Sequence, residues 1–127
     1  MSLLSACSKK QSTRSGCPIV PCPLDLGTFV TYVNNDGSAI EVKDFHAVDL
    51  RTNTTITTSG TVKLNPGTYV IADYSDSKLF SAAGDDVQVT ATDSLTGQIK
   101  TVNFKLALPV CSCGIEKISG PDTVKFN

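Results

Sequence analysis

Two stretches of the chain alternate strictly between apolar and polar residues. Between positions 87 and 92, Val87, Val89 and Ala91 fall on one face and polar residues fall on the other. Between positions 98 and 108, apolar side chains recur at every second position from Val102 to Leu108. Since successive side chains of a strand point to opposite faces, both stretches are predicted to be half-buried β-strands.

Shorter apolar runs separated by turn residues predict the other elements. Asn65-Pro66-Gly67 places Pro and Gly at the centre of a type II turn, and no window shows the 3.6-residue apolar stripe of a helix. The further strands expected are Thr28–Val33, Ile40–Lys43, Phe45–Leu50, Thr54–Thr58, Thr61–Leu64, Thr68–Tyr74, a short edge strand Lys78–Ser81 and a C-terminal strand Thr123–Phe126.

About eight strands with frequent turns predict an all-β fold, a two-layer antiparallel β-sandwich of about seven to nine strands. The length of 127 residues fits one domain. The apolar positions predicted to form its core are Phe29, Val33, Val48, Leu50, Val62, Leu64, Tyr69, Ile71, Val87, Val89, Val102, Phe104 and Leu106.

Composition supports this fold and excludes one class of partner. Val, Ile and Thr are abundant whereas Glu occurs only at positions 41 and 116, and β-branched residues favour strands. The net charge of −1 hides three basic residues in the first 16 positions, which leave eight basic and twelve acidic residues in the remainder. A net acidic body argues against nucleic-acid binding, which requires a basic face.

The leading segment contains Leu4-Ser5-Ala6-Cys7, which resembles a bacterial lipobox. In such signals the cysteine is acylated and becomes the mature N-terminus, so the resemblance implies lipidation of Cys7 and a membrane anchor. Only six residues precede Cys7, and we interpret residues 1–16 as a truncated lipoprotein signal followed by a polar tether. Residues 17–127 are then the single β-sandwich domain.

Four other cysteines flank the predicted sandwich: Cys17 and Cys22 near its start, and Cys111 and Cys113 near its end. Pairing the first two with the last two would tie the ends of the domain together. Four thiolates could instead hold zinc, or the thiols could stay free. Export to an oxidising compartment favours disulfides, and we expect no metal or other cofactor.

The stretch Gly60–Tyr69, with its Pro-Gly turn, is similar to bacterial transthyretin-like domains, which include the carboxypeptidase regulatory-like and Cna-B-like modules. Asn35–Ile40 resembles their early Asp-Gly turn. The similarity covers roughly residues 28–75 and implies a transthyretin-like or immunoglobulin-like sandwich in which Tyr69 packs across the core. These motifs carry no catalytic residues. With the lipobox, the chain looks like the small lipoproteins of Bacteroidetes-type bacteria.

Candidate chemistry is sparse. His46 is the only histidine, and without a neighbouring nucleophile it is a poor general base. Aspartates cluster in predicted loops at positions 73, 76, 85, 86 and 93, where turn chemistry explains them and calcium binding is the alternative. Sugar binding would need exposed rings, for which Tyr32 and Tyr74 are the candidates.

The sequence therefore predicts a non-enzymatic structural or protein-interaction module, anchored by a lipid to the outer membrane of the cell envelope and facing the periplasm or the outside. Its expected partners are the membrane and an envelope protein, with no nucleic acid. The alternative is an accessory ligand-binding domain for carbohydrate or calcium.

Overall fold

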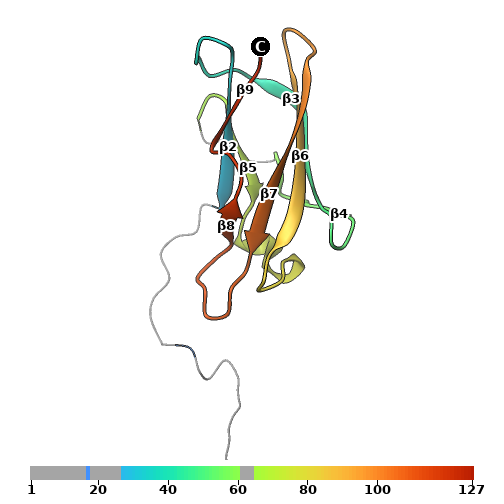
Figure 1. Cartoon of the computed structure of the whole chain (residues 1–127), viewed down its shortest axis with the longest axis vertical. Coiled ribbons are helices and arrows are strands. Elements are labelled where there is room, and N and C mark those ends of the chain that lie inside the picture. Colours follow the sequence, from blue (N-terminus) through green and yellow to red (C-terminus); the bar gives the residue numbers. More distant parts are fainter. Residues whose placement is uncertain (1–16, 18–26, 61–64) are drawn as a thin grey trace, which may run out of the picture.

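The computed structural model describes Cys17, residues 27–60 and residues 65–127, and it is an all-β sandwich of two facing sheets (Figure 1). One sheet has the strand order β5-β2-β9 and the other the order β4-β3-β6-β7-β8. The elements are β2 (Thr28–Val33), β3 (Val42–Asp49), β4 (Thr54–Thr55), β5 (Thr68–Ala72), the 3-10 helix η2 (Tyr74–Leu79), β6 (Asp85–Asp93), β7 (Ile99–Ala107), β8 (Glu116–Ser119) and β9 (Thr123–Lys125).

The two alternating stretches form the centre of the larger sheet, as predicted. β6 and β7 pair antiparallel from Asp85↔Leu106 to Thr92↔Ile99. Their inward faces bury Val87, Val89, Phe104 and Leu106, with Val102 half-buried against them. The pairing is antiparallel throughout the larger sheet, whereas β9 runs parallel to β2 in the smaller one.

The bounds predicted for β2 are confirmed, but the predicted inward face is wrong. Val30 and Tyr32 are buried, while Phe29 and Val33 are half-buried on the other face. Both faces of this strand carry apolar side chains, so alternation does not identify the inner one. Tyr32 lies on the inner face, where its ring centroid is 5.7 Å from that of the buried Phe126.

β3 is one strand where two were predicted. Its register with β6 shifts between Lys43 and His46, and Asp44 has a φ of 55°. The irregularity has the character of a β-bulge, which inserts a residue and changes which side chains face inward. Val48 is consequently half-buried and Leu50 is 46% exposed, whereas the predicted core contained both.

Two further elements differ from the prediction. Lys78–Ser81 is not an edge strand, because residues 74–79 form η2. Asp73 caps η2: its carboxylate accepts from the Ser75 N–H (2.9 Å), and Asp76 accepts from the Asp73 N–H (3.0 Å). This reciprocal capping box is strong enough to start a helical turn. β8 was not predicted at all, and the predicted strand Thr61–Leu64, with core positions Val62 and Leu64, lies outside the described residues.

An aromatic cluster fills the space between the sheets. Tyr32 meets Phe45 and Tyr69 edge-on, and Phe45 stacks on Tyr69 with centroids 5.3 Å apart. The buried Tyr69 hydroxyl accepts from the Val42 N–H at 3.0 Å, which ties the smaller sheet to β3 across the core. The predicted packing of Tyr69 and Ile71 in the core is therefore confirmed.

Candidate functional site

A disulfide joins Cys17 to Cys111 across 94 residues, with the two Cα atoms 5.2 Å apart. Closing a loop of this length stabilises the fold by roughly 4 to 5 kcal/mol in the chain-entropy model. Cys113 is also disulfide-bonded. Cys7 and Cys22 lie outside the described residues. The prediction that an early cysteine pairs with a late one is thus confirmed for Cys17 and Cys111.

The sandwich has two ends that carry different features (Figure 1). The hairpin end consists of η2, residues 81–84 and the β7–β8 connection 108–115, which contains Cys111; the Leu108 N–H donates to the Ser81 carbonyl and joins two of these segments. The loop end consists of the connections 34–41 and 94–98 at the opposite ends of β3, β6 and β7. Of the predicted site residues that the structure describes, Cys111 and Cys113 lie in the connection 108–115 at the hairpin end, and Cys17 is bonded to Cys111 there.

Two buried aspartates, Asp49 and Asp85, meet just inside the hairpin end. Asp49 is the last residue of β3 and Asp85 the first of β6, and they are 0% and 1% exposed. Oδ1 of Asp49 accepts from the Arg51 backbone N–H at 2.9 Å. Oδ1 of Asp85 accepts from Nε of Arg51 and from the Ser81 hydroxyl, both at 2.7 Å. Each carboxyl group therefore has one oxygen fully engaged by donors.

The remaining oxygens explain the charge state of the pair. Among the described residues, Oδ2 of Asp49 and Oδ2 of Asp85 are both buried and receive no donor from another residue. The two carboxyl groups are hydrogen-bonded to each other when one proton lies between them. A shared proton satisfies both oxygens and avoids placing two like charges in a buried site.

The surroundings determine which aspartate holds the proton. Burial, together with the neighbouring Asp85 carboxylate, raises the pKa of Asp49 to about 6. Burial opposes ionisation of Asp85 as well, but hydrogen bonds from Arg51, the Asp49 carboxyl and Ser81 hold the pKa of Asp85 below its usual range. Arg51 also donates to the Leu79 carbonyl at 2.8 Å, so the pair holds the end of η2 in place.

The aspartate pair has the composition of an acid–base dyad but lacks the access that catalysis needs. With both carboxyl groups buried, no substrate atom can reach them, and their chemistry is confined to the fold. Sequence reasoning placed Asp85 in a turn and did not single out Asp49. Asp49 follows β-branched and apolar residues in a strand, and only the changed register of β3 brings it to the inner face.

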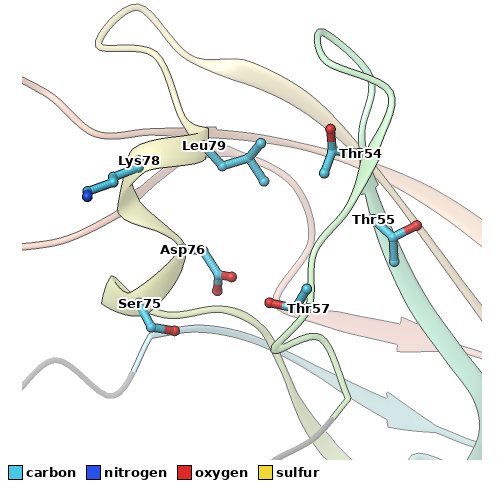
Figure 2. Close-up of a pocket in the computed structure, with 7 residues that line it drawn as sticks. All are labelled: Thr54, Thr55, Thr57, Ser75, Asp76, Lys78 and Leu79. Atoms are coloured by element: carbon cyan, nitrogen blue, oxygen red, sulfur yellow. The ribbon is translucent and has the colours of Figure 1, made fainter.

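A pocket of about 240 Å³ lies between η2 and the β4 segment (Figure 2). Its lining is rich in hydroxyl groups and consists of Thr54, Thr55, Thr57, Ser75, Asp76, Lys78 and Leu79. In Figure 2 the Asp76 carboxylate points toward Thr57, whereas the Lys78 side chain points away from the pocket. Asp76 accepts from the Thr58 hydroxyl and from the Asp73 N–H, so hydrogen bonds within the fold occupy it.

A larger pocket, of about 410 Å³, lies at the loop end. It is lined by Asn34, Ala39, Ile40, Glu41, Asp93, Ser94 and Leu95. Asp93 is buried there, and its Oδ1 accepts from the Leu95 N–H at 2.9 Å. This hydrogen bond, followed by one from the Thr96 N–H, holds the pKa of Asp93 below its usual range. Leu95 itself is 92% exposed at the rim.

The other residues predicted as candidates for catalysis, metal binding or sugar binding do not come together in one site among the described residues. His46 is exposed, and its Nδ1 donates to the Asp44 carbonyl at 2.9 Å. Within Cys17, residues 27–60 and residues 65–127, no three His, Cys, Asp or Glu side chains come together as a metal site. Of the two rings proposed as sugar platforms, Tyr74 is 54% exposed but Tyr32 is buried. No helix in the described part of the chain is long and apolar enough to cross a membrane.

No protein-family model, no curated protein and no solved structure matches the chain.

Proposed function

We propose that this protein is a non-enzymatic, extracytoplasmic module with a structural or protein-interaction role, held at the outer membrane by a lipid on Cys7. We also propose that the chain is a small lipoprotein of the Bacteroidetes type and that its sandwich is transthyretin-like. It is the function that best combines the lipobox, the polar segment after it and the disulfide-tied sandwich.

The Cys17–Cys111 disulfide is the observation that carries the proposal. A bridge across 94 residues, with a second disulfide at Cys113, is typical of proteins that fold in an oxidising compartment. The disulfides agree with the lipobox, because lipoproteins mature outside the cytoplasm, where disulfides form. An interaction role is supported by the loop end, where Leu95, which lines the larger pocket, is 92% exposed and Ile99, the first residue of β7, is 65% exposed.

The test is the state of the cysteines in protein isolated from the cells that produce it. Mass spectrometry without reductant should find acyl chains on the peptide that begins at Cys7, and Cys17 linked to Cys111. In detergent phase separation the wild type and a Ser8→Ala control should enter the detergent phase, whereas Cys7→Ser should enter the aqueous phase. An unmodified Cys7, or a Cys7→Ser variant that partitions like the wild type, would refute the anchor.

A second candidate is binding of a carbohydrate, and the pocket beside η2 favours it. Hydroxyl-bearing residues of β4 and η2 line it together with Asp76, and sugars are bound through such polar groups. Binding on a glycan array that is lost in Thr57→Val but kept in a Thr101→Val control would support this function. Equal binding by both variants, or none by the wild type, would reject it.

A further inference from the structure

We propose that the hairpin end of the sandwich faces the membrane and that the loop end points away from it. This inference rests on the proposed lipid anchor at Cys7. It adds which surface lies against the lipid headgroups and which surface is presented to a protein partner.

The length of chain between the anchor and the fold supports this orientation. Ten residues separate Cys7 from Cys17 along the sequence, and the disulfide attaches Cys17 to Cys111 at the hairpin end. A flexible chain of that length has an end-to-end distance of about 17 Å. The nine residues of β6 span about 30 Å from one end of the sandwich to the other. The tether is thus shorter than the body that it holds.

The disulfide fixes the point at which the tether ends, because Cys17 is bonded to Cys111 in the β7–β8 connection. A tether of about 20 residues would span about 25 Å, which is comparable with the sandwich itself, and would let either end approach the membrane. Attachment at Cys111 therefore orients the sandwich in addition to stabilising it.

The side chains of the hairpin end fit a headgroup surface. Val110, next to Cys111, is 80% exposed, and Tyr74 in η2 is 54% exposed. Lys78 is exposed in the last turn of η2. Apolar, tyrosyl and lysyl side chains of this kind are suited to the boundary between lipid and water, where the apolar part is shielded and the polar tip stays hydrated. The larger pocket, at the loop end, is left open to a partner.

The test places donor dyes at the two ends of the full chain on vesicles. Ala82, exposed at the hairpin end, and Leu95, exposed at the loop end, are replaced in turn by an amino acid that accepts a dye. The Cys7 thiol is coupled without reductant to a maleimide lipid in phosphatidylcholine vesicles that contain an acceptor-labelled lipid, and peptide mapping verifies the coupled residue. Because the lipid is attached chemically, the result does not depend on acylation in cells.

We expect stronger energy transfer from position 82 than from position 95. Inserting a flexible segment of about 40 residues after Gln11 should reduce the difference, because a tether of about 50 residues spans about 39 Å and exceeds the length of the sandwich. Equal transfer from both positions, stronger transfer from position 95, or a difference that the insertion does not reduce would overturn the proposal. A positive result with an unacylated Cys7 in cells would instead refute only the anchor.

Discussion

The buried aspartate pair makes the stability of the fold depend on pH in a direction opposite to that of most carboxylates. In the folded protein the pKa of Asp49 is raised from 3.8 to about 6, so below that pH one proton is held between Asp49 and Asp85. In the unfolded chain both groups titrate near 4. Between pH 4 and pH 6 the folded state therefore binds one proton more than the unfolded state.

The linkage relation gives the sign and the size of the effect. Stability falls as pH rises wherever the folded state holds the extra proton, by about 1.4 kcal/mol per pH unit for one proton. The stabilisation from Asp49 is complete below its unfolded pKa and is lost as pH rises through about 6. Over about two pH units the free energy of unfolding should decrease by roughly 3 kcal/mol.

Acid destabilises the fold through other groups. The pKa of Asp85 is held below its usual range, as are those of Asp36 and Asp93. Each of these carboxylates adds stability that is present above its unfolded pKa and is lost as pH falls through the folded value. Maximum stability is therefore expected between pH 4 and pH 6, with a decline on both sides.

Urea unfolding followed by circular dichroism, at pH values from 3 to 8, measures this profile. Asp49→Asn should remove the decline between pH 4 and pH 7, since its Oδ1 still accepts from Arg51 and its amide replaces the shared proton. At pH 8 this variant should be more stable than the wild type by about 1 to 3 kcal/mol. Equal pH profiles for the wild type and Asp49→Asn would show that no proton is shared.

Asp85→Asn is the matched control, because it changes the other member of the pair. It too should flatten the profile, but it replaces the charged partner of Arg51 with a neutral one, and Arg51 holds the end of η2. At pH 7 it should therefore be less stable than Asp49→Asn. The order of the two variants distinguishes proton sharing from a general effect of removing a buried charge.

Two further predictions concern the core. Gly120→Ala should lower the free energy of unfolding by more than about 2 kcal/mol, because φ is +129° and a Cβ would lie 2.2 Å from the Phe104 ring. Gly37→Ala is the control: φ is +93° with open space around it, so the loss should be only about 1 kcal/mol in urea unfolding. Equal losses would contradict the packing at Gly120. Tyr32→Phe should leave the stability unchanged or raise it slightly, because the buried hydroxyl has no partner among the described residues. Tyr69→Phe should lower the stability by about 1 to 3 kcal/mol, because it leaves the buried Val42 N–H unpaired. The reverse order of the two variants in thermal unfolding would be evidence against these contacts.

The sequence determined the class of fold and the elements with a clear period. β6 and β7 were predictable because apolar residues recur at every second position, at Val87, Val89 and Ala91 in β6 and at Val102, Phe104 and Leu106 in β7, and this period identifies a strand with one buried face. The bounds of β2 were predictable because turn residues at Asn34–Gly37 end it. Pairing of an early cysteine with a late one followed from their places at the two ends of the domain.

The tertiary structure decided which face of a strand is buried and which distant residues meet. β2 is apolar on both faces, and only the cluster around Phe126 selects Tyr32 for the interior. The shift at Asp44 turns Asp49 inward, where it meets Asp85 from another strand. Local pattern carries no information about such contacts, because one inserted residue reverses the face of every side chain that follows it.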